Sequence, residues 1–245
     1  AGPPDTADFI HIPAAFSALF RSQNDWDLGT GYEPGLEDRR VYLPRGKTLG
    51  GSSSINAMIY IRGNPADYDE WSDLGWGWND VLPYFLRAED NTRGASEHHG
   101  VGGPLRVSDS LARTGLSQAF LDAAAAHGLP ASEDFNARQQ DGIGWYQVTH
   151  KNGERFSAAK AYLTPNLGRP NLKVFTEAHT TRVLFEGRRA TGIEIRQGGR
   201  LQRLGARHEV LLSAGALQSP QLLMLSGVGK GKELARHGIA VVHDL

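Results

Sequence analysis

The chain has 245 residues, of which 40% are hydrophobic and 22% charged, a composition typical of a globular protein with one large domain or two small ones. The formal net charge of −1 excludes strong attraction to nucleic acid or to an acidic membrane, and no apolar run approaches the roughly 20 residues of a transmembrane segment. The absence of cysteine excludes thiol catalysis, thiolate metal sites and disulfides, and is compatible with a cytoplasmic location.

Both ends of the sequence indicate that the chain is truncated. The chain opens with Ala1-Gly2-Pro3-Pro4, which lacks a Met and is typical of the break after a strand. The last residues, 239–245, have the pattern of a strand whose continuation is missing. We therefore expect a fold that is incomplete at both ends.

The first half of the sequence predicts short helices joined by loops. An apolar segment at residues 12–20 is followed by polar loop and by a Gly/Ser-rich stretch at residues 45–56. Capping residues then mark the starts of helices. These starts are Asn64 with Pro65, Asn79, and Thr114, whose helix ends at Gly128.

The second half changes to β character. Short β-branched runs separated by turn residues predict an antiparallel meander, with strands at residues 171–175, 181–185, 190–196 and 201–204. The continuous apolar run 209–213 predicts a buried parallel strand. A small-residue turn at residues 214–216 then leads to a helix with Ser219 as N-cap and Pro220 as first residue, and a further helix covers residues 232–237.

The most informative segment is Pro44-Arg45-Gly46-Lys47-Thr48-Leu49-Gly50-Gly51-Ser52-Ser53-Ser54-Ile55-Asn56. The paired glycines allow a sharp turn that exposes backbone N–H groups. If a helix begins at Ser52, its N-terminus would favour an anion, and Arg45 and Lys47 add positive charge. A pyrophosphate is therefore the expected ligand. A surface loop of glycine and serine is the alternative.

This segment, continued by Ala57-Met58-Ile59-Tyr60-Ile61-Arg62-Gly63, closely resembles the first signature of the glucose–methanol–choline (GMC) oxidoreductases. The second signature is similar to the segment that begins Gly215-Ala216-Leu217-Gln218-Ser219-Pro220. Further similarity, for example in Arg155-Phe156-Ser157-Ala158-Ala159, extends the resemblance over essentially the whole chain. It is nearest to the bacterial choline-dehydrogenase-like branch.

The resemblance implies a mixed α/β fold. We expect a Rossmann-like, three-layer FAD-binding domain with an antiparallel-sheet substrate domain, both incomplete. Residues 1–107 would belong to the FAD-binding domain without its GxGxxG unit, residues 108–162 to the substrate domain, and residues 163–245 to the FAD-binding domain again.

The resemblance also implies FAD, bound non-covalently because residues 46–49 contain no histidine. Ser52 would meet the pyrophosphate, Asn56 and Ala57 would lie at the flavin end, and Thr180 would offer its backbone to the adenine. For Asn56 a turn amide and for Thr180 an ordinary strand-edge residue are the alternatives. The complete set of expected cofactor-binding residues is Arg45, Lys47, Gly50, Gly51, Ser52, Asn56, Ala57, Met58, Ile59, Thr180, Ala214 and Gly215.

No catalytic residue is predicted within the chain, because the resemblance places the histidine base beyond Leu245. His98 and His99 are interpreted as part of a solvated loop, and no histidine spacing predicts a metal site. Trp145 and Tyr146 could line a substrate pocket, although core aromatics are the commoner case.

The predicted function is FAD-dependent oxidation of an alcohol to an aldehyde or ketone, by hydride transfer to flavin N5, as part of a longer parent enzyme. The electron acceptor would be oxygen or another molecule, and the particular alcohol and the oligomeric state stay open. Two alternatives remain. One is an FAD-containing lyase similar to hydroxynitrile lyases, and the other is a truncated, inactive module that binds cofactor weakly.

Overall fold

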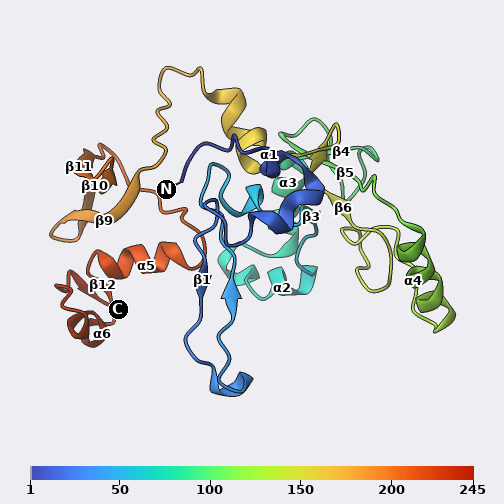
Figure 1. The fold of residues 1–245 in the computed structure, drawn as a ribbon, viewed down its shortest axis with the longest axis horizontal. Coiled ribbons are helices and arrows are strands. Elements are labelled where there is room, and N and C mark those ends of the chain that lie inside the picture. Colours follow the sequence, from blue (N-terminus) through green and yellow to red (C-terminus); the bar gives the residue numbers. More distant parts are fainter. Residues whose placement is uncertain (1) are drawn as a thin grey trace. The chain divides into compact units, whose positions relative to one another are not determined.

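A computed structural model describes residues 2–245 and contains two compact units (Figure 1). The larger unit covers residues 4–174, and the smaller covers residues 175–245 together with Gly2 and Pro3. Both helices and several small sheets are present, so the mixed α/β class is confirmed. No helix within residues 2–245 combines the length and the apolar character needed to cross a bilayer.

The larger unit is built around a four-stranded sheet with the order β3-β6-β5-β4. Its strands β4 and β5 are parallel, and the other pairs are antiparallel. Two short hairpins, β1–β2 and β7–β8, accompany it. The strand bounds are Leu28–Gly29 (β1), Tyr42–Leu43 (β2), Ile59–Tyr60 (β3), Glu89–Asn91 (β4), Leu105–Asp109 (β5), Gln147–Val148 (β6), His150–Lys151 (β7) and Glu154–Arg155 (β8).

Two of the three predicted helix starts, Asn64 and Thr114, are confirmed, whereas α3 has Gly77 and not Asn79 as its N-cap. The side chain of Asn64 accepts a hydrogen bond from the Ala66 amide at 3.0 Å at the start of α2, and Thr114 Oγ1 accepts from the Ser117 amide at 3.2 Å at the start of α4. The helices are α1 (Asp8–His11), α2 (Pro65–Asp69), α3 (Trp78–Ala88) and α4 (Gly115–Ala126). Short turns of 3-10 or π helix add Pro13–Leu19, Pro34–Leu36, Gly51–Ser54, Ser72–Leu74, Ala159–Leu163 and Thr164–Asn166.

A small apolar core supports the glycine–serine segment. Ile10, Leu19 and Ile55 are at most 2% exposed and form one cluster, against which Ala7 and Phe20 pack. Because Ile55 directly follows the three serines, its burial fixes one end of that segment to α1 and to the 3-10 turn Pro13–Leu19.

The smaller unit contains the predicted antiparallel meander, with strand order β11-β10-β9. Its strands are β9 (His179–Glu186), β10 (Arg189–Gln197) and β11 (Arg200–Gly205). Helix α5 (Gln218–Leu225) lies against β9, where Ser226 Oγ accepts a hydrogen bond from the Val183 amide at 2.8 Å. Strand β12 (Val228–Gly229), helix α6 (Gly231–Arg236) and strand β13 (His243–Asp244) complete the unit, and β12 and β13 are parallel.

Several expectations for this half are wrong. Residues 171–175 and 209–213 form no strand, and Leu211 is 78% exposed instead of buried. The reason is that an extended apolar run becomes a strand only when another strand pairs with it, and none of the described residues pairs with these runs. The N-cap of α5 is Leu217, because the Ser219 hydroxyl instead accepts a hydrogen bond from the Ala214 amide at 2.9 Å.

Candidate functional site

The glycine–serine segment forms a tight loop with one short turn of 3-10 helix, Gly51–Ser54. A helical turn therefore does begin next to Ser52, but it is a 3-10 turn and not an α-helix. Gly50 and Gly51 both have positive φ, +84° and +55°, which bends the chain too sharply for a regular helix to start there. A Cβ at Gly50 would collide with Ser54 Oγ, so this position needs glycine.

The loop is held by its own hydroxyl groups. Ser53 Oγ donates to the Gly50 carbonyl and Ser54 Oγ to the Leu49 carbonyl, each at 2.6 Å. Ser52 differs from both because it is exposed, and its hydroxyl accepts a hydrogen bond from the Gly46 amide at 3.2 Å. Of the three serines, Ser52 thus offers its hydroxyl hydrogen at the surface.

The basic residues before the loop are fixed mainly through their backbone. The Arg45 amide donates to Asp25 Oδ1 at 3.0 Å, and the Lys47 amide donates to the Asn24 carbonyl at 2.7 Å. The Lys47 ammonium lies 5.0 Å from the centre of the Trp26 ring. The side chains of Arg45 and Lys47 are half-buried, so both keep access to solvent beside the loop.

The Asp25 carboxylate holds the segment that leads into the loop. Burial alone would raise the pKa of its carboxyl group, but hydrogen bonds from the Tyr42 hydroxyl and from the amides of Arg21, Arg45 and Asp27 outweigh it and lower that pKa. Asp25 is therefore a charged acceptor that ties residues 21–27 to the strand before the loop.

After the loop, residues 56–59 form a turn into β3. Asn56 and Ala57 are exposed, whereas Met58 is 4% exposed and has a positive φ of +61°. The Met58 amide donates to Asn56 Oδ1 at 3.0 Å, which stabilises this uncommon backbone conformation. Ile59 is exposed and pairs with Val148 of β6.

Sequence reasoning missed Arg155, which lies beneath this turn. Its side chain is 1% exposed and donates from Nη1 to the carbonyls of Ser53 (3.1 Å) and Asn56 (2.7 Å) and to Asn56 Oδ1 (2.9 Å). Its Nε donates to the Ile10 carbonyl at 2.7 Å. Burial lowers the pKa of Arg155 to about 10. The only sequence signal is its position within a segment of family similarity.

His150 lies on the other side of Met58. Its Nε2 is 3.1 Å from the Met58 sulfur, and the Thr149 amide donates to the Met58 carbonyl at 2.9 Å. Burial, followed by the positive charge of Arg155, lowers the pKa of His150. The imidazole is therefore neutral near pH 7 and suits contact with a thioether.

Two of the three site residues predicted in the smaller unit, Thr180 and Ala214, line one cavity. Thr180 on β9 and Ala214, after the extended run 209–213, both line a space of about 490 Å³ with Ile193 and Leu222. Gly215 is exposed and has a φ of +92°, which turns the chain into α5. The structure thus brings Thr180 and Ala214 together although they are far apart in the sequence.

The interpretation of His99 as part of a solvated loop is wrong. His99 is 6% exposed, with Nδ1 donating to the Glu89 carboxylate (3.0 Å to Oε1) and Nε2 donating to Asp134 Oδ2 (2.6 Å). The hydrogen bond to Asp134, followed by the one to Glu89, raises the pKa of His99 to about 9. Arg62 Nη2 also pairs with Glu89 Oε2 at 2.9 Å, so the buried charges balance.

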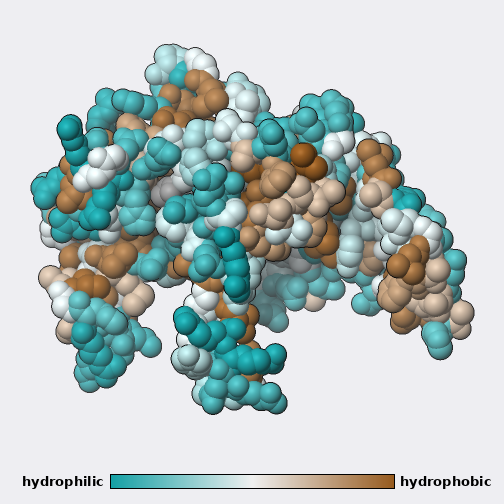
Figure 2. All heavy atoms as spheres, viewed as in Figure 1, coloured by the Kyte–Doolittle hydropathy of each residue, from teal (hydrophilic) through white to brown (hydrophobic). Residues whose placement is uncertain are grey.

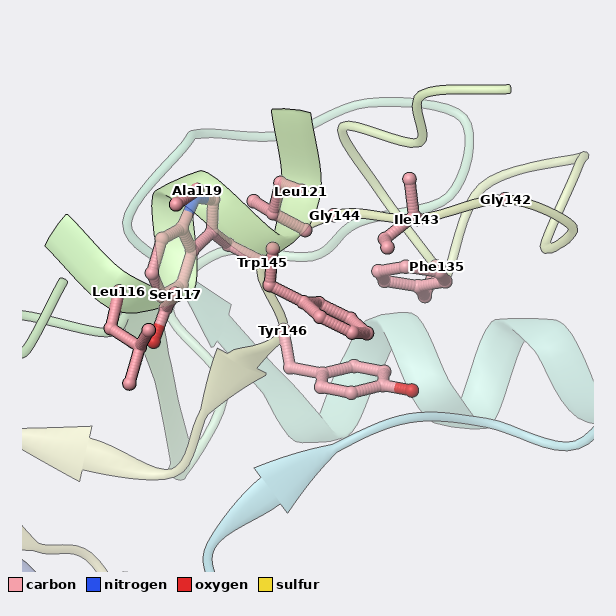
Figure 3. Close-up of a pocket in the computed structure, with 11 residues that line it drawn as sticks. Leu116, Ser117, Ala119, Leu121, Phe135, Gly142, Ile143, Gly144, Trp145 and Tyr146 are labelled. Atoms are coloured by element: carbon pink, nitrogen blue, oxygen red, sulfur yellow. The ribbon is translucent and has the colours of Figure 1, made fainter. Parts of the chain in front are cut away.

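Trp145 and Tyr146 line a cavity of about 790 Å³ beside α4 (Figure 3). Tyr146 packs against Phe135 with ring centroids 4.7 Å apart. The apolar surface continues onto α4, where Leu116 and Phe120 are 84% and 69% exposed (Figure 2). Within residues 2–245, no group of three His, Cys, Asp or Glu side chains is arranged to hold a metal ion.

The chain is thus a mixed α/β protein with a tight glycine- and serine-rich loop at residues 46–56. Residues 24–240 match the family model described as GMC oxidoreductase, and the chain belongs to that family.

Relatives and solved structures agree with this assignment. The chain is 46% identical to "Alcohol dehydrogenase [acceptor]" of Pseudomonas putida (100% of this chain, 46% of the relative) and 47% identical to "Choline dehydrogenase, mitochondrial" of Homo sapiens (96% and 40%). The structure of pyridoxine 4-oxidase from Mesorbium loti is similar at a TM-score of 0.94 and 36% identity, over 100% of this chain and 49% of that one. An FAD-dependent oxidoreductase from Chaetomium thermophilum is similar at 0.91 and 32%, over 100% and 45%. The chain thus spans about half the length of these proteins, and a flavin is the cofactor that the family membership indicates.

Proposed function

We propose that this chain supplies the middle part of the FAD site of an enzyme that oxidises an alcohol to an aldehyde or ketone. FAD, when bound, supplies the hydride acceptor, its N5 atom. The observation that carries the proposal is the loop at residues 46–56, where glycine backbone, an exposed serine hydroxyl and a buried guanidinium meet within the GMC family pattern.

The loop fits an anionic dinucleotide. Apart from Gly51 and its two neighbours in the chain, no atom of the described residues lies within 4 Å of the position where a Cβ of Gly51 would stand, so there is open space beside the backbone. The exposed hydroxyl of Ser52 and the charges of Arg45 and Lys47 suit a pyrophosphate, together with the backbone of Gly50 and Gly51.

The turn after the loop fits the flavin end. Asn56 and Ala57 are exposed beside the buried Met58, and Ile59 is the first residue of β3. In the smaller unit, Thr180, Ala214 and Gly215 are proposed for the adenosine end, since small side chains let the backbone come close to a base. We propose the division into parts at residues 1–107, 108–162 and 163–245 on the same basis.

Binding is proposed to be non-covalent, because residues 46–55 include no histidine, tyrosine or cysteine. We assign no catalytic residue within the chain. His99 is buried between two carboxylates, and His150 faces the Met58 sulfur, so neither imidazole is free to take a proton from an alcohol. The base is proposed to lie beyond Leu245, in the part of the parent enzyme that this chain does not include.

The names of the relatives favour redox chemistry over the lyase alternative, since the relatives named above are dehydrogenases and oxidases. A small-molecule alcohol is the proposed substrate, with oxygen or another molecule as electron acceptor. A cytoplasmic location is part of the proposal, and cell fractionation with an antibody to the chain tests it.

The direct test is to mix the purified chain with excess FAD, remove free flavin by gel filtration and record the visible spectrum. We expect a flavin absorption band at roughly 450 nm that elutes with the protein. The Ser52→Ala variant should hold less flavin, and Ser17→Ala, at an exposed serine of the 3-10 turn Pro13–Leu19, serves as control. Colourless protein at saturating FAD would show that this chain does not hold the cofactor.

A further inference from the structure

Arg155 is a buried cation without a counter-ion. Its guanidinium is almost fully inaccessible, and no carboxylate within residues 2–245 lies within 4 Å of it. Its Nη2 atom is buried and has no hydrogen-bond partner in the described chain. Burying a charge without a counter-ion costs folding free energy, so packing alone does not explain why an arginine stands at this position.

The contacts of Arg155 fix the orientation of the Asn56 side chain. Asn56 Oδ1 accepts from both Arg155 Nη1 and the Met58 amide, at 2.9 and 3.0 Å. Two donors on this atom identify it as the amide oxygen, so the NH₂ group points away from Arg155. That group has no acceptor within residues 2–245, and Asn56 is exposed.

The same arginine orients the next peptide group. It binds the Asn56 carbonyl at 2.7 Å, and the peptide bond to Ala57 is trans. In a trans peptide the C=O and N–H bonds point in opposite directions, so the Ala57 N–H is directed away from the guanidinium. This amide also has no hydrogen-bond partner within the described residues, and Ala57 is exposed.

We infer that Arg155 is the positioning residue for the flavin end of the site. From beneath the turn it holds the Asn56 NH₂ group and the Ala57 N–H toward an electron-rich acceptor on the exposed side, and its charge strengthens both donors. The inference rests on the proposed function, because that function supplies the isoalloxazine ring as the acceptor. Arg155 itself touches only the protein.

The first test needs no flavin. Amide hydrogen exchange is measured on the 245-residue chain and on the variants Arg155→Met, Arg155→Lys and Arg106→Met. The last is the control, since Arg106 pairs with Asp90 elsewhere in the same unit. Arg155→Met should speed exchange of the Met58 amide at least roughly tenfold, because each hydrogen bond from a charged donor contributes about that factor. Arg155→Lys should give a smaller increase and Arg106→Met none.

The second test uses FAD itself, by titration and by the midpoint potential of the bound flavin. Arg155→Met should weaken binding roughly tenfold and make the potential more negative, since positive charge favours the electron-rich reduced form. Arg155→Lys, which keeps the charge, should restore the potential more than the affinity. A purely structural role would leave the potential of bound flavin unchanged.

The outcomes separate the role of Arg155 from the proposed binding of FAD. Unchanged Met58 exchange in both Arg155 variants would overturn the positioning role, whatever the flavin does. Equal potentials in wild type and Arg155→Met would overturn the electrostatic role. A wild-type chain that binds no FAD would contradict the proposed function, while the exchange data alone would still decide the positioning role. If Arg155→Met does not fold, Arg155→Lys decides the positioning role by itself, because lysine cannot make the forked contacts of the guanidinium.

Discussion

His99 Nε2 lies 2.6 Å from Asp134 Oδ2, and this contact joins two loops whose residues are 35 positions apart in the sequence. On its other side the same ring meets Glu89, which is fully buried and also pairs with Arg62. Because both ring nitrogens donate to carboxylates, the imidazole is held as a cation. His99 therefore connects β4 to the segment that leads into Phe135 and Asn136.

This arrangement predicts a pH-dependent stability. The pKa of His99 is raised to about 9 from its ordinary 6.5. The contribution of His99 to the free energy of unfolding is therefore complete below about pH 6.5 and is lost as the pH rises through 9. The pKa values of Glu89 and Asp134 are lowered, so their contribution is lost as the pH falls below their ordinary range. Urea unfolding from pH 5 to 10 should show a decline of about 1–3 kcal/mol above neutrality.

The variant His99→Gln should be less stable near pH 6 and should lose this decline. The exposed His208→Gln is the matched control and should behave as wild type. A decline of equal size in His99→Gln would assign the pH dependence to other groups.

A second prediction concerns the loop backbone. Gly50→Ala should destabilise the chain by about 1–3 kcal/mol, because alanine is strained at a φ of +84° and its Cβ would meet Ser54 Oγ. Gly35→Ala, where nothing lies within 4 Å of the new Cβ, should change stability by less than about 0.5 kcal/mol. Thermal unfolding of the two variants side by side makes the comparison, and equal effects would refute the strain argument.

A third prediction concerns the junction of α5 with β9. Ser226 is buried, accepts from the Val183 amide and donates to the Leu222 carbonyl. Ser226→Ala leaves that amide unsatisfied and should cost about 1–3 kcal/mol. Exposed Ser213→Ala should cost almost nothing. Guanidinium unfolding curves provide the measurement, and a neutral Ser226→Ala would mean that the two elements do not depend on this contact.

A fourth prediction concerns the attachment of the flavin. Chain reconstituted with FAD and then precipitated with acid should leave all of the yellow colour in the supernatant, because no histidine stands in the loop before Gly50. Colour that stays with the protein pellet would demonstrate a covalent bond. The same experiment on Ser52→Ala should show less total flavin and the same distribution.

A fifth prediction is that the 245-residue chain alone reduces no dye in the presence of alcohols. The reason is that the base is proposed to lie beyond Leu245, and that the imidazoles of His150 and His99 are already engaged with Met58 and with two carboxylates. Steady dye reduction by the purified chain, dependent on both alcohol and FAD, would contradict this expectation. A boiled sample and a sample without FAD are the controls.

Local chemistry explains which elements can be predicted. Asn64 and Thr114 are helix caps as the sequence predicts, because a cap depends on residues two or three positions away. The meander β9–β11 is predictable for a similar reason, since Gly187, Gly198 and Gly199 mark its turns with positive φ.

Long-range pairing explains what cannot be predicted. The run 209–213 has the composition of a buried strand, but strand formation depends on a partner that composition does not reveal. His99 has the sequence context of a solvated loop because its partners Glu89 and Asp134 lie in other segments. The role of Arg155 is hidden for the same reason, since its acceptor on Asn56 is 99 residues earlier in the chain.

That separation between Arg155 and Asn56 also sets an order of events in folding. The arginine reaches back 99 residues, and β3 pairs with β6 over a similar span, so the turn at Asn56 lacks both of these contacts until Arg155 has been synthesised. The loop 46–56, although local in sequence, is thus completed by a late, long-range closure. A ribosome-bound chain that stops before Arg155 would carry the glycine–serine segment without the hydrogen bonds that Arg155 donates to Ser53 and Asn56.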